Sequence, residues 1–457
     1  MDESAAHLLA DIEAYCQQAG IAESTFGRQA INDGKLCARL RGGKSITLST
    51  AQKVQEFIES NTAEHELTLA DAGPAEVSAP GLVVPDRPFR FYDNRQKYLA
   101  FVNTCNEKWK IAERATRELA HLRPSPPAVR LFDAGVGDGT VLGYVMRAMH
   151  QRYPTLPHYV VGKEISLEDV RLSLEKLPDR FVEHPATVVV FTNLHYAEAP
   201  WLMPRDINKA AALNWREVEL DGTSAFEYGQ QLGEMDDFLV DAWQTSASPK
   251  TGNPLYVRPS VMIMYRKDHK FLLDSVLPRP GQAGANYDLV VVSQPWRART
   301  GADFKVKHVL SPLARSLGPA GRLLAVQSFG RDPGMEIVQK IWPEEDPFTV
   351  NRHELLKTLK DSLVNEARNF NFNAYSDGKA ILQYQMHTLP DEIASSIGTS
   401  TLFAAWNAAI YVAQIADQKL DKAMLSREYL NATAEVLQKY NGLWFNDESF
   451  VVSRRAP

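Results

Sequence analysis

The chain has 457 residues, which is long for a single domain, and its 44% hydrophobic and 23% charged residues are typical of a globular protein. The net charge of −6 argues against a protein that binds nucleic acid over its whole surface, although a local basic face stays compatible with that sum. The acidic start and the lack of a long apolar run argue against a signal peptide and a membrane span, so we expect a cytoplasmic protein without a membrane partner. Cys16, Cys37 and Cys105 are scattered and odd in number, which favours neither a disulfide framework nor a zinc cluster.

Residues 1–60 are predicted to form a small all-α domain. Apolar residues with helical spacing open the segment, namely Leu8, Leu9, Ile12 and Tyr15. Further short helices are expected on both sides of a turn at Asn32 to Gly34, and another is expected to begin at Ser49, which is a plausible N-cap.

These short helices resemble the helix-turn-helix domains of phage repressors. The resemblance implies DNA binding through residues 28–44, where the basic residues would create a local positive field. The basic residues are Arg28, Lys35, Arg39, Arg41 and Lys44. A helical cap or a dimerisation module with solvated basic residues is an equal alternative, so DNA binding and homo-oligomer formation both stay open.

Two segments separate this domain from the first expected strand. Residues 61–88 are rich in Ala, Pro, Gly and acids without a sustained period, which predicts a linker. Residues 89–122 have a helical pattern whose apolar side contains Tyr98, Phe101, Val102, Cys105, Trp109 and Ala112. The second domain is therefore predicted to span residues 89–457 and to begin with lead-in helices.

The segment VRLFDAGVGDGTVL, residues 129–142, predicts a buried strand that ends at an acid and enters a glycine-rich loop. Its glycines are Gly135, Gly137 and Gly139, and without a Cβ they let the backbone approach a ligand. Asp133 and Asp138 would repel the phosphates of a dinucleotide, so the loop favours a cationic or hydroxyl-rich ligand. Asp138 is also a candidate N-cap for the helix that follows.

DAGVGDG resembles the D/E-x-G-x-G-x-G signature of class I S-adenosylmethionine-dependent methyltransferases. YVVGKEIS, residues 159–166, resembles their second signature, a strand that ends in an acid. The resemblance implies S-adenosylmethionine as the cofactor, with the glycine loop and Asp133 at its methionine part and Glu164 at its ribose hydroxyls. A nicotinamide enzyme also uses an acid after the second strand, but its G-x-G-x-x-G pattern is absent.

The remaining chain alternates strands and helices, which predicts an α/β fold with a Rossmann-like sheet and helices on both faces. Strands are expected at residues 130–133, 159–162, 187–191, 287–292 and 322–327, and helices at 141–153 and 167–177. The end of the chain, from ILQYQMHTLP through an apolar helix to LWFNDESFVVSRR, is expected to supply the last strands.

A long insertion is expected at about residues 204–285, between the third and fourth of these strands. Residues 261–265 and 271–276 flank the sequence RKDH and predict a β-hairpin within it. An insertion here would cover a pocket or mediate assembly.

The loop after the expected strand 287–292 reads Ser293-Gln294-Pro295-Trp296 and resembles the S/N/D-P-P-Y/W/F loop of adenine N6 and cytosine N4 methyltransferases. The resemblance implies that Ser293 accepts a hydrogen bond from the target amine and that Trp296 stacks on the base. Gln294 stands where that family has its first proline. A structural proline loop after a parallel strand is the alternative.

The loop after the third strand contains Asn193, which the resemblance places near the adenine ring, and His195, a candidate base or substrate contact. A surface or core-edge histidine is the alternative. HxxxH, HExxH and CxxC patterns are absent, so no metal is expected.

Three functions stay open. The favoured one is O- or N-methylation of a small molecule, because the insertion and the C-terminal helices suit a closed pocket better than an open groove. The alternatives are a nucleic-acid amino-methyltransferase that uses the SQPW loop and a DNA-binding regulator with a methyltransferase-like sensor domain.

Overall fold

The computed structural model describes residues 95–247, 254–388, 391–394 and 396–456, and, before residue 95, residues 8–9, 12–13, 16, 23–31, 33–42, 50–51, 54 and 57. Internal contacts divide the chain into two units, Met1–Pro85 and Asp86–Pro457. In the described part of the chain, no helix is both long and apolar enough to cross a bilayer.

The first unit contains helices α2 (Glu23–Ile31) and α3 (Leu36–Arg41). They share a core with the other described apolar residues of this unit, namely Leu8, Leu9, Ile12, Cys16, Phe26, Leu36, Cys37, Leu40 and Val54. A small helical unit is thus present. Tyr15, Asn32, Lys44, Ser49 and the expected linker 61–88 lie outside the described residues.

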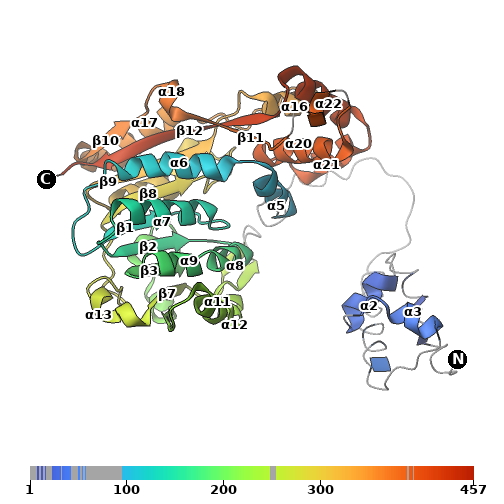
Figure 1. Ribbon diagram of the computed structural model, residues 1–457. Helices are drawn as coiled ribbons and strands as arrows, with labels where there is room; N and C mark the ends of the chain where they lie inside the picture. Colours follow the sequence, from blue (N-terminus) through green and yellow to red (C-terminus); the bar gives the residue numbers. More distant parts are fainter. Residues whose placement is uncertain are drawn as a thin grey trace. The chain divides into compact units, whose positions relative to one another are not determined.

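Five parallel strands form the centre of the second unit, in the order β3-β2-β1-β8-β9 (Figure 1). Their bounds are β1 Val129–Asp133, β2 His158–Lys163, β3 Thr187–Thr192, β8 Tyr287–Ser293 and β9 Leu317–Ser328. Runs of Val, Leu and Ile suit strands buried on both faces. This is the 3-2-1-4-5 order of doubly wound sheets, so the predicted Rossmann-like α/β fold is confirmed.

The sheet extends beyond β3 through β7 (Ser260–Arg266), which is antiparallel to β3, and β4 (Asn214–Leu220), which is parallel to β7. The predicted hairpin is therefore wrong, because β7 pairs with β3 and not with residues 271–276. Those residues contain helix α13 (Lys270–Leu273). Leu273 and Val276 are buried while Phe271 and Leu272 are exposed, which is helical spacing and not strand alternation.

Antiparallel strands complete the other side of the sheet. β12 (Trp444–Arg454) pairs with β9 and also with β10 (Phe370–Asn373) and β11 (Ile381–Gln385). The expected final strands are thus confirmed, whereas β10 was not predicted. A separate two-stranded sheet joins β5 (Thr245–Ala247) to β6 (Pro254–Tyr256).

Helices cover both faces of the main sheet (Figure 1). One face packs against α6 (Glu107–Leu119), α7 (Thr140–Arg152), α8 (Leu167–Glu175), α9 (Pro178–Glu183), α11 (Ala225–Gly233) and α12 (Asp236–Ala242). The other packs against α14 (Ala302–Lys305), the π-helix η4 (Val306–Leu310), α15 (Ser311–Arg315) and α17 (Arg352–Leu363). Strand side chains alternate between these two cores.

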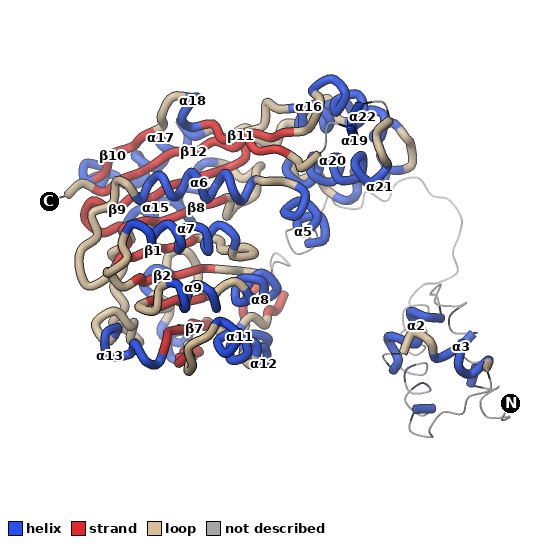
Figure 2. Tube along the Cα trace, viewed as in Figure 1, coloured by secondary structure: helices blue, strands red, loops and turns tan. Residues whose placement is uncertain are grey.

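A third hydrophobic core joins helices that group beside one end of the sheet (Figure 2). It joins the lead-in helix α5 (Arg95–Thr104) to α16 (Pro333–Ile341), α20 (Thr399–Val412), α21 (Asp417–Met424) and α22 (Glu428–Tyr440). The short remaining elements are η2 (Ala199–Trp201), α10 (Ile207–Ala211), η3 (Lys267–His269), η5 (Val364–Asn369), α18 (Asp377–Ala380) and α19 (Asp391–Ala394). Helix α5 therefore packs against helices that lie more than 200 residues further along the chain.

Candidate cofactor and acceptor site

One cavity of about 340 Å³ lies at the carboxyl ends of β1, β2 and β8. This volume is at the lower end of the range for small-molecule sites. Its lining residues are Tyr98, Glu107, Lys108, Ala134, Gly135, Gly137, Lys163, Glu164, Ile165, Asp169, Tyr196, Ser293, Gln294, Pro295, Trp296, Arg297, Tyr411, Val412 and Gln414. The glycine loop, the acid after β2 and the SQPW loop, all predicted from the sequence, thus share one cavity.

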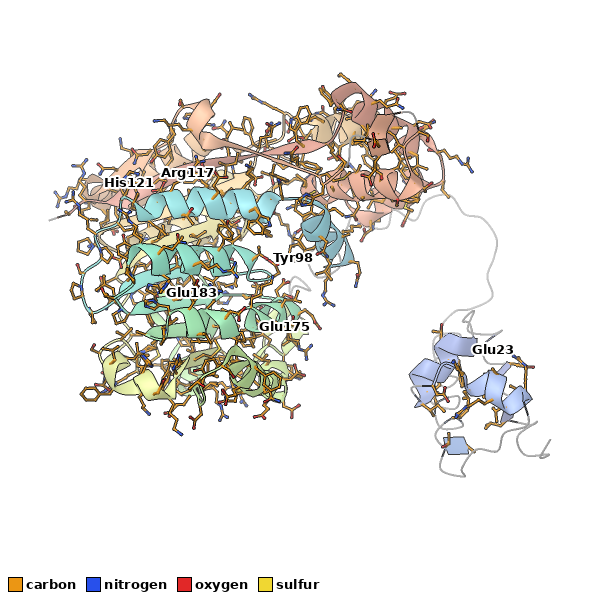
Figure 3. The ribbon with its side chains drawn as sticks, viewed as in Figure 1. Glu23, Tyr98, Arg117, His121, Glu175 and Glu183 are labelled. Atoms are coloured by element: carbon orange, nitrogen blue, oxygen red, sulfur yellow. The ribbon has the colours of Figure 1, made fainter. Side chains whose placement is uncertain are left out.

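The glycine loop adopts a backbone that favours glycine at two positions. Gly137 and Gly139 have φ values of 56° and 79°, in the left-handed region. A Cβ at Gly137 would stand 2.9 Å from the Tyr98 hydroxyl, and one at Gly139 would stand 2.9 Å from Ser173. Tyr98 lies on α5, next to the N-terminal end of α7, which follows the glycine loop (Figure 3). The loop is therefore tightly packed against α5 and α8.

The carboxylate of Glu164 is held by three backbone N–H groups. Gly137 donates to Oε2 at 2.7 Å, while Ile165 and Ser166 donate to Oε1 at 2.6 and 2.9 Å. Glu164 is 5% exposed and lines the cavity. Because a carboxylate accepts about four hydrogen bonds, it retains capacity for a ligand hydroxyl. Glu164 thus fixes the glycine loop while it faces the ligand space.

The two acids of the glycine loop lie just outside the cavity lining. Asp133 is buried and accepts a hydrogen bond from the Gly135 N–H at 3.2 Å. Burial raises the pKa of Asp133 to about 7 against the opposing effect of that bond. Asp138 accepts from the N–H of Thr140 at 3.3 Å and from the ammonium of Lys176 at 2.6 Å. The N-cap of α7 is Gly139 and not Asp138, so the predicted N-cap is wrong, and Asp138 contacts the helix start from the preceding position. Asp138 and Gly139 do not line the cavity.

Asp169 is an acid of the cavity that the sequence analysis missed. It lies on α8, is 3% exposed and lines the cavity. Burial first, and then the nearby Glu164 carboxylate, raise the pKa of Asp169 to about 7. Its position three residues after the N-cap Ser166 identifies only a helix start, so no sequence signal marked it as a ligand group.

Gln294 bridges the SQPW loop to two buried acids. Its Nε2 donates to Glu107 Oε1 at 2.9 Å and to Asp447 Oδ1 at 3.2 Å, and its Oε1 accepts from the Ser328 hydroxyl at 3.2 Å. Its φ of 48° lies in the left-handed region. Proline is restricted to a φ near −65°, so a first proline of the resembled motif does not fit this backbone.

Trp296 is held in place by its ring nitrogen. Nε1 donates to Gln327 Oε1 at 3.2 Å, and the same oxygen accepts from Lys305 Nζ at 3.2 Å. Lys305 Nζ also lies 5.6 Å from the centre of the indole ring. Trp296 and Ser293 line the same cavity as the glycine loop, and their contact with an acceptor stays a prediction.

Asn193 and His195 are placed differently from their predicted roles. Neither lines the cavity. The Asn193 amide donates to the carbonyls of Ala242 and Arg258 and accepts from the Ser260 N–H. These hydrogen bonds join the end of β3 to the 204–285 insertion. His195 is exposed in the turn that follows. A contact of Asn193 with adenine and a catalytic role of His195 therefore have no support from this geometry.

The cavity walls also include residues outside the sequence motifs, from the lead-in helices and from α20. Glu107 and Lys108 begin α6, while Tyr411 and Val412 end α20. In the described part of the chain, no residue of the insertion lines the cavity. Instead, the insertion packs behind Glu164, whose carbonyl accepts from the Trp243 ring nitrogen at 2.9 Å. The described residues also contain no cluster of three or more His, Cys, Asp or Glu suited to a metal ion.

Neither a protein-family model nor a curated protein matches the chain. Among solved structures it is similar to a provisionally assigned sarcosine dimethylglycine methyltransferase from Galdieria sulphuraria, at 10% identity and a TM-score of 0.30, over 76% of this chain and 86% of that one. It is also similar to geranyl diphosphate methyltransferase in complex with SAM, at 14% identity and a TM-score of 0.28, over 76% and 85% of the two chains. Such distant likenesses assign no function, and the chemistry of the cavity is the basis for one.

Proposed function

We propose that the chain is an S-adenosylmethionine-dependent methyltransferase that acts on a small molecule. The observation that carries the proposal is the single cavity shared by the glycine loop after β1, the acid after β2 and the polar-aromatic loop after β8. All three follow parallel strands, and ligands of open α/β sheets bind outside the carboxyl ends of such strands.

The cofactor is a cation with ribose hydroxyls, and the cavity matches both properties. Glu164 and Asp169 line it, and Asp133 lies directly behind it. In this proposal the methionine part lies at Gly135 and Gly137, the ribose binds Glu164, and the adenine lies against Ile165. The same acids would repel a dinucleotide pyrophosphate, which disfavours a nicotinamide cofactor.

The acceptor is proposed to enter from the side of Ser293 and Trp296. Methyl transfer needs the nucleophile, the methyl carbon and the sulfur in line, so these residues act mainly by positioning. α5 and the end of α20 supply Tyr98 and Tyr411 as walls of the same space. A small molecule fits such a many-walled cavity better than a nucleic-acid duplex does.

Calorimetric titration of the purified protein with S-adenosylmethionine, S-adenosylhomocysteine and NAD tests the proposal. We expect both sulfur compounds to bind with one site per chain and NAD not to bind. Binding of NAD alone, or of none of the three, would refute the cofactor assignment.

A further inference from the structure

Lys163 is a buried cation of the cavity that the proposed methyl transfer does not use. It is the last residue of β2, it is 4% exposed and it lines the cavity. Its side chain is on the strand face that carries Tyr159 and Val161, opposite to the face covered by α7 and α8. The ammonium lies 4.7 Å from the centre of the Tyr196 ring.

Within the described residues, no hydrogen bond and no carboxylate within 4.0 Å is found for the Lys163 ammonium, which contacts the Tyr196 ring and faces the cavity. An isolated buried ammonium is costly, so such a group is normally paired or neutral. Burial indeed lowers the pKa of Lys163 to about 8, although Glu164 opposes the shift. The tyrosine ring compensates only part of the lost hydration.

A second lysine already serves the cofactor end of the cavity. Lys108 Nζ lies 4.0 Å from the point where a Cβ of Gly137 would stand, and 3.7 Å from Glu107 Oε2. The methionine carboxylate is the only anionic group of the proposed cofactor. Since Lys108 is at the glycine loop, Lys163 is left for an anion that the cofactor does not supply.

We infer that Lys163 binds an anionic group of the acceptor, a carboxylate or a phosphate, in the space between Tyr196 and Trp296. Arg297 is an exposed residue of the same cavity lining, so a second cation is available to an anionic molecule that enters. The inference rests on the proposed function and narrows its substrate class to anionic small molecules.

The test measures how fast an amine-acetylating reagent modifies Lys163 in protein saturated with S-adenosylhomocysteine, by mass spectrometry. Inorganic phosphate and acetate are the probes, and sodium chloride at equal ionic strength is the control. An anion bound to Lys163 keeps its amine protonated, so we expect at least about fivefold slower modification with one or both probes. Lys267, an exposed lysine paired with Asp221, serves as the internal control and keeps its rate.

Protection by phosphate alone assigns a phosphate acceptor, and protection by acetate alone assigns a carboxylate acceptor. Protection by neither overturns the inference. In a second measurement, phosphate or acetate should raise the melting temperature of the parent protein and of Lys163→Arg but not of Lys163→Met. Met keeps the volume and removes a buried charge, so the variant is expected to fold.

The affinity for S-adenosylmethionine separates this inference from the proposed function. If Lys163→Met keeps the parent affinity within about twofold, the lysine does not serve the cofactor, as we infer. A loss of about tenfold or more in that variant would assign Lys163 to the cofactor and overturn the inference. If the parent itself fails to bind S-adenosylmethionine, the proposed function fails, whereas anion protection of Lys163 in the unliganded protein still decides the anion site.

Discussion

At the scale of single residues, we expect the protonation state of two buried carboxyls to control how tightly a cation binds in the cavity. Burial raises the pKa of Asp133 and of Asp169 to about 7. For an acid, a raised pKa means that the neutral form persists to higher pH, so near pH 6 both groups are mostly uncharged. A cationic ligand favours the ionised form and lowers these pKa values on binding.

The affinity for S-adenosylmethionine is therefore expected to rise with pH between 6 and 8, by about tenfold if one of these groups must ionise. Calorimetric titrations at several pH values measure this directly. Asp169→Asn should flatten the pH dependence and weaken binding at pH 8. An affinity that stays constant over this range in the parent would contradict the assigned role of these acids.

Glu164 tests the proposed ribose contact. Glu164→Gln removes the charge and places an amide donor against one of the backbone N–H groups of Gly137, Ile165 and Ser166. We expect affinity for S-adenosylmethionine to fall at least about tenfold, because one buried donor loses its acceptor and the ligand hydroxyls lose a carboxylate.

Glu168→Gln is the matched control, since Glu168 is a neighbouring and more exposed acid paired with Arg171. The affinity of Glu168→Gln for S-adenosylmethionine and its melting temperature should equal those of the parent. If Glu164→Gln binds the cofactor as tightly as the parent does, Glu164 is only a structural anchor of the glycine loop.

At the scale of elements, the loop after β8 shows why a motif departs from its family pattern. The Gln294 N–H donates to the Val326 carbonyl at 3.0 Å, and its φ is 48°. Gln294→Pro restores the proline of the resembled motif but loses this bond and cannot reach this φ. We expect it to destabilise the protein by about 2 to 4 kcal/mol.

Gln294→Gly separates the two causes. Glycine accepts the left-handed backbone and keeps the N–H, but it loses the side-chain bonds to Glu107, Asp447 and Ser328. In chemical denaturation, Gln294→Pro should therefore be the less stable of the two variants. The reverse order would mean that the side-chain bridge matters more than the backbone geometry.

The sequence predicted the elements that local patterns define, and it missed those that depend on distant partners. Continuous apolar strands and a glycine loop carry their own signal, so β1, β2, β3 and β8 were predicted within about two residues. The pairing of β7 with β3 has no local sequence signal, because a short apolar strand has the same pattern in a hairpin and in a central sheet. The cavity walls at Lys108 and Tyr411 come from helices whose packing no local pattern encodes.

The candidate site shows the same limit at finer detail. Residue type and strand position placed Glu164, Ser293 and Trp296 on the cavity. They could not show that the Asn193 amide already makes its hydrogen bonds with the insertion, since its partners lie about 50 to 70 residues further along the chain. Lys163 was adjacent to a recognised acid, but only the fold shows that it is buried on the cavity, against the Tyr196 ring and, among the described residues, without a carboxylate partner.

At the scale of the whole molecule, charge decides between the small-molecule and the DNA interpretation. The net charge is −6, so DNA binding needs a local basic face. In the first unit, Arg39 pairs with Asp33, and Arg41 pairs with both Glu13 and Glu23. Two of the three described basic side chains of the predicted face, Arg39 and Arg41, are thus paired with acids of the same unit, and Lys35 is exposed. The side chains of Arg28 and Lys44 lie outside the described residues.

We therefore expect no salt-dependent binding of duplex DNA by the full chain. Fluorescence anisotropy with a labelled duplex, at salt concentrations from about 50 to 200 mM, measures this, because each phosphate contact adds about one unit to the slope of log affinity against log salt. Arg39→Ala combined with Arg41→Ala is the control for the predicted face. If the parent binds with a slope of several units and this variant loses that binding, the ion pairs open for DNA. In that case a nucleic-acid acceptor or a regulatory role would replace the small-molecule proposal.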